Sequence, residues 1–480
     1  MDVGILSYGL YVPRRRLQRN SIYQTNRWYA PGLGGLAKGE KAISNWDEDP
    51  VTMAVEAGRY CMDGIDRGLV ESISLASTTL PFADRSNAGI VKEALNLSDN
   101  VMSADCTGSL RAGTSSLMHA LQNSAMALCL AADRRKSKVA STEEMNYGDA
   151  SAAVLAGSGE VIAKYLGGYS KSIDFVDHYR ETGADFDYAW EARFVRDEGY
   201  QKILGSAIGA ALEKLGISAA AVDHAVISVP LRGVPQKLAA VAGIAPEAVA
   251  DSHMATVGDT GVSHPMLMLA MTLQNAKPGE KVLLASFGQG ADVMVFETTQ
   301  HLPAVNQRQA HFIQPGLPDT NYSRYLFHRG LLDIDKGMRA ELDEKQPGTS
   351  LARDRKTVLG LIGGKCSESG IVQFPKTDLP VNTLSRAKGT FEDYPLADRV
   401  AKVLSYTADR LAYSPDPPSY YGMIDFNGGG RMVAEFADIE EGEAEVGREM
   451  RMVFRIKAFD TLRGFRKYFW KAIPVQRGES

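Results

Sequence analysis

The sequence predicts an α/β layered region over about the first 300 residues, followed by a small all-β domain. In the first region, short β-rich runs alternate with Ala-rich helical stretches. In the second, between residues 356 and 475, Gly, Pro and Asp turns separate short strand-like runs. With 480 residues, of which 44% are hydrophobic, the chain can bury a large core divided between two or three domains.

The first region contains two similar halves. Strands are expected at 3–13, 72–78, 223–230 and 281–297, and helices at 50–65, 109–124, 200–216 and 264–276. Two strand-like segments, 149–159 and 290–300, close the halves in similar fashion, which indicates an internal duplication. We therefore expect one half over residues 1–165 and the other over 166–300.

The composition of the remaining chain changes near residue 355. Residues 301–355 are polar and contain Arg and Tyr, which predicts a helical connector. Residues 356–480 form the all-β domain, for which the short strands favour a barrel over a sandwich.

Composition excludes several classes of partner. The formal net charge of -5 leaves no basic footprint for nucleic acid or an anionic membrane surface. Four scattered cysteines do not make a disulfide framework, which fits a reducing, cytoplasmic compartment. The first residues lack the order of a signal peptide, and no apolar run approaches the ~20 residues of a membrane span.

Cys106 stands out as a candidate nucleophile. It follows a strand-like stretch, 100–105, and precedes a small-residue helix in which Gly108, Ala112 and Gly113 allow close packing. Unpaired N–H groups and the dipole at a helix start would stabilise a thiolate there, and a thiolate can hold an acyl group as a thioester. The other interpretation, a small buried hydrophobe, is equally open from position alone. Cys61 and Cys129, on apolar helical faces, are assigned to the core.

The order of motifs over the first 300 residues resembles bacterial and archaeal 3-hydroxy-3-methylglutaryl-CoA synthase-like proteins of the thiolase superfamily. The matching stretches are GILSYGLYVPRRRL, KAISNWDEDPVTMAVEAG, LASTTLPFADRSNAG, DCTGSLRAGTSSL, NYGDASAAVLAG, FVDHYR, WEARFVRDEGY, GDTGVSHPMLMLA and SFGQGADVMVFE. The resemblance implies a thiolase fold of duplicated α/β/α/β/α layers and a homodimer. It also implies Cys106 as the acyl-accepting nucleophile, a coenzyme A thioester as substrate without a permanently bound cofactor, and an oxyanion-hole loop at Gly288 and Gly290.

The acid/base residues of that family are altered here. Thr78 stands where the family has a Glu, and Thr cannot take a proton from an acetyl methyl group at neutral pH. Ser228 stands at the family's His, and Asp259 at its Asn. His264 is the best remaining imidazole, and either handles protons or only packs at a helix start. Asp259 either orients His264 or a water, or caps the helix.

Coenzyme A phosphates require cations near the substrate. Arg232, Lys237, Arg193 and Arg196 are candidates, although each also fits a solvated surface charge, and only Arg232 joins Thr78 and Ser228 in the expected substrate-binding set.

The C-terminal part, about 320–475, resembles the zinc-ribbon plus OB-fold proteins encoded beside thiolases. In that family two Cys-x-x-Cys pairs hold zinc, whereas here the corresponding positions carry Cys366, Ser369, Leu379 and Asn382. One thiolate cannot hold a structural zinc, so we expect a metal-free ribbon. An OB fold can bind oligonucleotides, but the acidic stretch DIEEGEAE and the lack of a basic groove argue against it.

These observations predict an acyl-CoA-dependent acyltransferase that forms or cleaves a carbon–carbon bond by Claisen-type chemistry through acyl-Cys106. The alternative is a scaffold that loads acyl-CoA and bridges to a separate thiolase. Loss of the acid/base residues favours the alternative, and the intact DCTGS motif disfavours complete inactivity.

Overall fold

A nine-stranded mixed sheet organises the first 300 residues of the computed structural model, which describes residues 2–309, 316–382 and 386–475. Its strand order is β11-β12-β13-β8-β1-β7-β6-β4-β5. The strands are β1 (Val3–Tyr11), β4 (Ser72–Ala76), β5 (Met102–Cys106), β6 (Ala127–Asp133), β7 (Ala150–Ser158), β8 (Ala163–Ser172), β11 (His224–Ser228), β12 (Lys281–Phe287) and β13 (Gly290–Thr298).

Strand pairing reveals the duplication that the sequence indicates. In the first half β4 runs parallel to β6, β6 antiparallel to β7, and β7 antiparallel to β1. In the second half β11 runs parallel to β12, β12 antiparallel to β13, and β13 antiparallel to β8. The halves join where β1 pairs with β8, so the ends of β6 and β12 occupy equivalent places.

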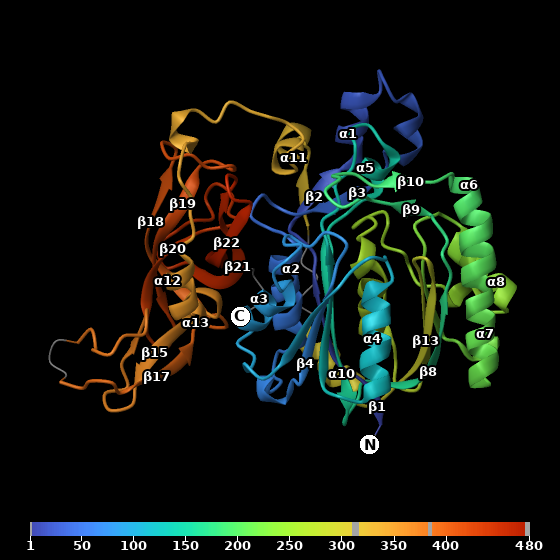
Figure 1. The fold of residues 1–480 in the computed structure, drawn as a ribbon, viewed down its shortest axis with the longest axis horizontal. Coiled ribbons are helices and arrows are strands. Elements are labelled where there is room, and N and C mark those ends of the chain that lie inside the picture. Colours follow the sequence, from blue (N-terminus) through green and yellow to red (C-terminus); the bar gives the residue numbers. More distant parts are fainter. Residues whose placement is uncertain (1, 310–315, 383–385, 476–480) are drawn as a thin grey trace. The chain divides into compact units, whose positions relative to one another are not determined.

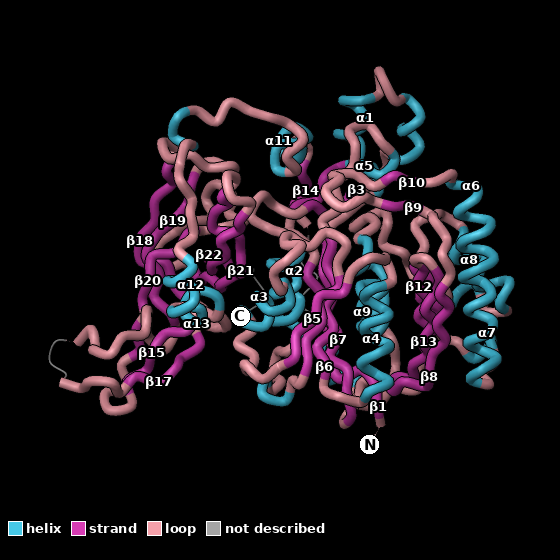
Figure 2. Tube along the Cα trace, viewed as in Figure 1, coloured by secondary structure: helices cyan, strands magenta, loops and turns pink. Residues whose placement is uncertain are grey.

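Helices pack on the strands in layers (Figures 1 and 2). Two of them, α4 (Ala112–Asn123) and α9 (His264–Asn275), contact strands of both halves and each other. Helix α2 (Pro50–Cys61) packs on β1, β6 and β7 of the first half, and α7 (Gly205–Leu215) packs on β8 and β13 of the second half. The central strands β1, β6, β7, β12 and β13 are mostly buried on both faces, as an α/β/α/β/α arrangement requires, whereas the edge strand β5 is exposed.

Two smaller sheets and several helices accompany the nine-stranded sheet. A three-stranded sheet joins β14 (Leu317–Asp319), β2 (Arg15–Gln18) and β3 (Glu40–Ile43), and a short hairpin pairs β9 (His178–Tyr179) with β10 (Tyr188–Ala189). The other helices up to residue 328 are α1 (Arg19–Asn26), α3 (Asn87–Ala94), α5 (Thr142–Asn146), α6 (Ala192–Phe194), α8 (Val234–Ala242), α10 (Leu302–Gln309) and α11 (Tyr322–His328). Helix α6 continues into α7 through a π-helical stretch, Val195–Leu204.

Contacts divide the chain into two units. The first holds most residues up to Leu331, and the second begins at Leu332 and also includes residues 46–48 and 90–97. The predicted boundaries after residues 165, 300 and 355 are finer than this division and stay predictions. No helix in the described ranges is long and apolar enough to cross a membrane.

The second unit contains a closed five-stranded antiparallel barrel, ordered β20-β19-β18-β21-β22. A bridge between Phe436 and Ala472 closes it, and the indole of Trp470 packs edge-on against Phe454 inside. The barrel strands are β18 (Ala401–Asp409), β19 (Ser419–Phe426), β20 (Arg431–Glu435), β21 (Glu449–Asp460) and β22 (Phe465–Pro474). The prediction of a barrel is therefore confirmed.

The chain from residue 356, where we expected only strands, begins with a helix. This is α13 (Arg355–Leu359), and strand β15 (Ile362–Cys366) starts only at Ile362. The predicted helical connector, residues 301–355, contains short helical pieces, namely α10, α11, a 3-10 turn at 338–340 and α12 (Gly348–Arg353), and Gly330, Gly337 and Pro347 lie between the last of them. Residues 310–315 of the connector lie outside the described ranges.

A capping box at the start of α2 is predicted to stabilise the first unit, and this prediction can be tested. The Asp49 carboxylate accepts a hydrogen bond from the Thr52 amide at 3.0 Å, and the Asp49 amide donates to the Thr52 hydroxyl at 2.8 Å. Because this capping box is buried, Asp49→Ala should lower the free energy of unfolding by at least about 1 kcal/mol. Urea unfolding should show this, with Asp66→Ala as the control because Asp66 caps only an exposed three-residue turn. An unchanged midpoint for Asp49→Ala would contradict the interpretation.

Candidate active site

Cys106 is the last residue of β5, the edge strand of the nine-stranded sheet. The expectation that it lies at a helix start is wrong, because α4 begins only at Ala112. Gly108 adopts a left-handed conformation (φ +90°) and begins a turn. This turn separates Cys106 from the first residue of α4. Thiolate stabilisation by the α4 dipole is therefore weak at Cys106, since this effect falls off within the first turn.

The Cys106 thiol is half-buried and hydrogen-bonds with the Ser116 hydroxyl of α4. Burial raises the pKa of Cys106 above its ordinary value, the Asp105 charge raises it further, and Ser116 opposes both. The group is thus a thiol at neutral pH, and its activation requires a base. The neighbouring Cys129 is fully buried in strand β6, not on a helix, and burial raises its pKa to about 11.

A cavity of about 740 Å³ opens beside Cys106. Its walls come from segments within 78–83, 105–110, 177–187 and 288–289, all in the first unit. Both neighbours of Cys106, Asp105 and Thr107, line the cavity, whereas Cys106 itself is not among the lining residues. The Asp105 carboxylate accepts hydrogen bonds from the amides of Asn87 (2.9 Å) and Ala88 (2.7 Å), so it caps α3 rather than acting as a free base.

Thr78 lines this cavity and is held by a buried carboxylate. Asp133, at the end of β6, accepts hydrogen bonds from the Thr78 amide (2.8 Å), the hydroxyls of Ser77 (2.9 Å) and Thr79 (3.0 Å), and the Val262 amide (2.9 Å). The Thr78 hydroxyl also lies 3.1 Å from this carboxylate. Its proton is engaged there, so Thr78 can position a substrate but not abstract a proton.

The glycine loop is fastened to the turn after Cys106. The Gly288 carbonyl accepts hydrogen bonds from the Ser109 hydroxyl (2.7 Å) and the Arg111 guanidinium (3.0 Å). A Cβ on Gly288 would meet the Ser109 oxygen at 2.7 Å, so glycine is required for this approach. The Gly288 amide donates to the Gly290 carbonyl at 3.1 Å, and Gly290 pairs with Ser172 in the sheet. Nothing in this arrangement supports the oxyanion-hole role expected of the Gly288 amide.

His264 and Asp259 do not line the cavity. The His264 ring is buried, with Nδ1 3.3 Å from the Thr260 hydroxyl, and burial lowers its pKa despite the charge of Asp259. Asp259 forms an ion pair with Arg135 at 2.8 Å; burial acts to raise its pKa, but Arg135 outweighs it and the net shift is downward. The roles expected of these two residues stay predictions without support from this placement.

The other expected substrate-binding residues also lie outside the cavity lining. Ser228 ends β11 opposite Ser286, and Arg232 is exposed before α8. The remaining cations are exposed too: Arg196 pairs with Asp197, Lys237 bonds Gln201, and Arg193 lies at the surface.

Sequence reasoning missed His178 and Arg180, which do line the cavity. The His178 Nδ1 lies 2.9 Å from the Asp177 carboxylate. Arg180 pairs with Asp187 at 2.6 Å and donates to the Thr78 carbonyl. The adjacent Asp and His of FVDHYR were the available signal, but adjacency alone does not indicate which cavity a side chain lines.

The ribbon of the second unit, β16-β15-β17 (β16, Val372–Gln373; β17, Phe391–Pro395), does not offer a zinc site. Cys366 is buried, and hydrogen bonds from Ser369 and Thr390 lower its pKa to about 7. Ser369, exposed Leu379 and Asn382 complete no tetrahedral thiolate set around it. Within the described ranges no group of three or more His, Cys, Asp or Glu could hold a metal ion.

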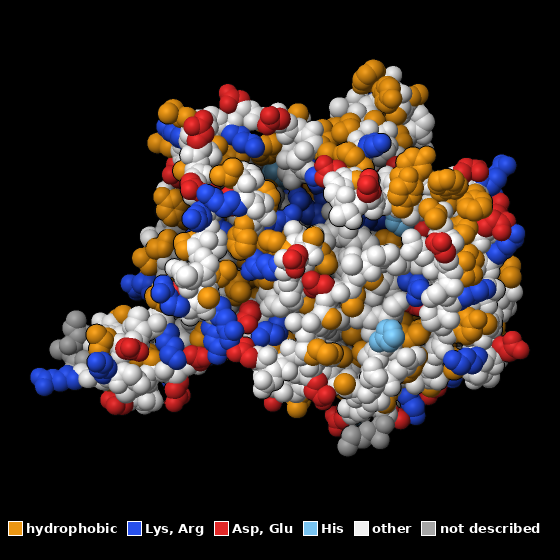
Figure 3. Space-filling view, in the orientation of Figure 1, with side chains coloured by type: hydrophobic (Ala, Val, Ile, Leu, Met, Phe, Trp, Pro, Cys, Tyr) orange, Lys and Arg blue, Asp and Glu red, His pale blue; other side chains and the backbone are white. Residues whose placement is uncertain are grey.

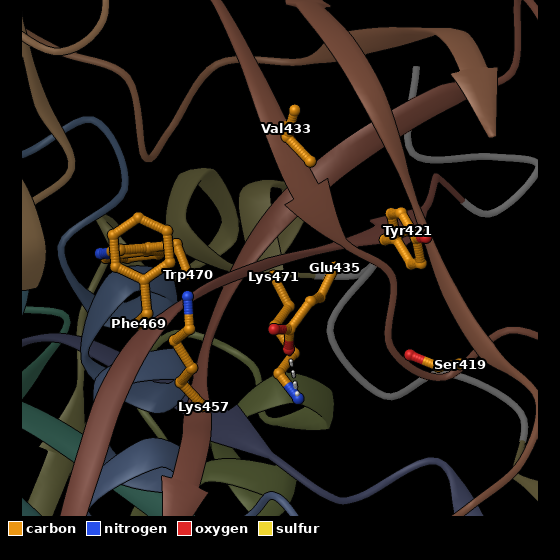
Figure 4. Close-up of a pocket in the computed structure, with 8 residues that line it drawn as sticks. All are labelled: Ser419, Tyr421, Val433, Glu435, Lys457, Phe469, Trp470 and Lys471. Carbon is orange, nitrogen blue, oxygen red and sulfur yellow. Dashed lines mark ion pairs between the residues drawn. The ribbon is translucent and has the colours of Figure 1, made fainter. Parts of the chain in front are cut away.

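A smaller cavity, about 230 Å³, lies on the barrel (Figure 4). Lys471 points there toward Glu435, with an ion pair of 3.3 Å, and also binds Asp47 at 3.0 Å. Two carboxylates thus compensate this lysine, and none of the residues predicted from the sequence lies in this cavity.

Comparisons with known proteins extend these findings. The chain is 30% identical over 354 residues to a hydroxymethylglutaryl-CoA synthase of Caldivirga maquilingensis, covering 70% of this chain and 100% of that protein. It is 29% identical over 350 residues to the synthase of Methanosarcina acetivorans, with the same two coverages. A family model described as the C-terminal OB-fold domain of ChsH2 matches residues 394–455.

Two solved structures share the fold of the first unit. MvaS in complex with 3-hydroxy-3-methylglutaryl coenzyme A aligns with a TM-score of 0.59 at 16% identity, covering 69% of this chain and 92% of that one. The 3-oxoacyl-(acyl carrier protein) synthase III FabH from Pseudomonas aeruginosa aligns with a TM-score of 0.55 at 18% identity, covering 62% and 98%. The predicted thiolase fold and OB-fold domain are thereby confirmed.

The raised pKa of Cys106 predicts its reactivity. Because only the thiolate reacts, carbamidomethylation of Cys106 by iodoacetamide should accelerate about tenfold per pH unit from pH 7 to 9. Peptide mass spectrometry distinguishes Cys106 from the other three cysteines. Ser116→Ala removes a hydrogen bond that lowers the pKa, and should slow the reaction further at each pH. A rate that is already constant above pH 7 would contradict the assignment.

Proposed function

Because the chain belongs to the hydroxymethylglutaryl-CoA synthase family, we propose that its first unit is an acyl-CoA-dependent acyltransferase with Cys106 as acyl carrier. Members of this family are enzymes of the thiolase superfamily that use Claisen-type chemistry. The observation that carries the proposal is the cavity whose walls include both neighbours of Cys106 and the glycine loop. Its volume of about 740 Å³ lies within the range of small-molecule sites.

The first chemical step is thioester exchange. The Cys106 sulfur attacks the carbonyl carbon of an acyl-CoA, the bond from that carbon to the CoA sulfur breaks, and the proton lost by the Cys106 thiol ends on the departing CoA thiolate. One thioester replaces another, so the step needs little driving force. In the second step a carbon nucleophile takes the acyl group from Cys106, and the direction can be synthesis or cleavage.

Hydroxymethylglutaryl-CoA synthesis itself is a poorer candidate than a related reaction on another acyl-CoA or β-keto substrate. Thr78 replaces the family's Glu and is bound to Asp133, and Ser228 replaces its His outside the cavity lining. The same changes favour a second candidate: a unit that loads acyl groups and passes them to a separate thiolase.

Acyl loading provides the test of the proposed function. Incubation with a panel of short acyl-CoAs should add one acyl mass to the intact protein, and Cys106→Ala should abolish the adduct. Cys366→Ala is the matched control, because Cys366 lies in the second unit and should leave loading unchanged. If no acyl adduct forms on the unaltered chain, the proposed enzymatic function is wrong. Loading without turnover until a thiolase is added would favour the second candidate.

We also propose a homodimer formed through the edge strand β5. Its residues Met102 to Asp105 are exposed, with Met102 at 69%, and β5 has a neighbour on only one side. An exposed strand edge offers free N–H and C=O groups that a second copy can pair.

A charge on this edge should weaken the dimer. Met102→Asp is expected to raise the dimer dissociation constant at least about tenfold, measured by sedimentation equilibrium. Met338→Asp is the control, since Met338 is 82% exposed in the second unit. A monomeric native protein, or equal dissociation constants for both variants, would refute the proposed interface.

A further inference from the structure

The hairpin of β9 and β10 presents different chemistry on its two faces. Tyr179 and Tyr188 are paired across the strands, 5.4 Å between ring centroids, and are 50% and 57% exposed. Hydrophobic side chains gather over β9, β10 and α6 on the molecular surface (Figure 3). Along β9, His178 alternates with Tyr179 and is more buried, and both residues line the cavity. The cross-strand aromatic pair supports the register in which His178 pairs with Ala189.

His178 has the surroundings of a proton-transfer group. Its side chain is 23% exposed, and the partner carboxylate, Asp177, is 7% exposed. Hydrogen bonding of Nδ1–H to Asp177 leaves the lone pair on Nε2 free to accept a proton. A partly exposed imidazole backed by a buried carboxylate is an arrangement that serves general acid/base catalysis.

His178 and Thr78 line the same cavity. Arg180, two residues beyond His178, donates to the Thr78 carbonyl and so connects the segment of His178 to the Thr78 turn. The charged groups that act on His178 are Asp177, Asp187 and, with opposite sign, Arg135. A base at this place would compensate for the Glu that Thr78 replaces.

We propose that His178, oriented by Asp177, is the general base and acid of the carbon–carbon bond-forming step. In that step Nε2 takes a proton from the α-carbon of a bound acyl-CoA, and the C–H electron pair passes to the enolate. The enolate carbon attacks the carbonyl of acyl-Cys106, the C–S bond breaks, and the imidazolium returns its proton to the Cys106 thiolate. The proposal rests on the proposed function of Cys106 as acyl carrier.

Proton exchange in deuterated buffer tests the proposal separately from acyl loading. The probe is the member of the short acyl-CoA panel, acetyl-CoA first, that loads Cys106. Mass spectrometry follows deuterium entering the α-carbon, expressed per mole of acyl-enzyme. His178→Gln should lower this rate at least about 100-fold. His224→Gln is the matched control, because His224 forms a similar 2.8 Å pair with Glu280 but does not line the cavity, and should leave the rate unchanged.

The pH profile provides a second readout that a merely structural role would not change. Burial acts to lower the pKa of His178, but Asp177 and Asp187 outweigh it and the net shift is upward. Exchange requires neutral imidazole, so its rate should fall as pH drops through this raised pKa. Asp177→Asn removes the main stabilisation of the imidazolium and should move the falling limb to lower pH.

The outcomes are distinguishable. If no acyl-CoA loads Cys106, the proposed function and this inference fall together. If loading occurs but His178→Gln exchanges as fast as the unaltered chain, or the unaltered chain shows no exchange, only the assignment of His178 is overturned. A limb that does not move in Asp177→Asn overturns the orienting role of Asp177.

Discussion

The candidate site depends on the buried carboxylate of Asp133. From the end of β6 it accepts hydrogen bonds from the 77–79 turn and from the Val262 amide, which precedes α9 in the second half. Ser77 and Val262 are fully buried, and each of their donors would cost about 1–3 kcal/mol if left without a partner. The carboxylate therefore ties the two duplicated halves together at the cavity wall, and commits the hydroxyl of Thr78 to a structural bond.

The polar groups near Asp133 do not have the roles that the family resemblance implies. Asp105 caps α3, Asp259 neutralises Arg135, and His264 is buried against Thr260. Apart from Asp105, the ionisable groups that line the cavity come from the hairpin segment, residues 177–187, which carries His178 and Arg180. The half-buried thiol of Cys106 and the imidazole of His178 lie on different segments of the chain, an arrangement compatible with acyl chemistry in which the base and the acyl carrier are separate groups.

Much of the fold follows from local patterns in the sequence. The alternation that predicts strands near residues 3, 72, 223 and 281 reflects burial of each strand, and the similar segments 149–159 and 290–300 became β7 and β13, equivalent strands of the two halves. The helix start after Cys106 was predicted wrongly, because the turn that follows Gly108 is held by the hydrogen bond of the Ser109 hydroxyl to Gly288, about 180 residues away in the sequence. His178 was missed for a similar reason: its place depends on how β9 pairs with β10 and on the distant Thr78 turn.

The central claim is that an acyl group attached to Cys106 occupies the cavity beside Thr78 and His178. A crystal structure of the protein soaked with a loading acyl-CoA tests it most directly. We expect continuous density from the Cys106 sulfur to an acyl carbon, and the α-carbon of a second bound acyl-CoA next to Nε2 of His178. Density for the acyl group on another residue, or an unmodified Cys106 with coenzyme A bound elsewhere, would contradict the account.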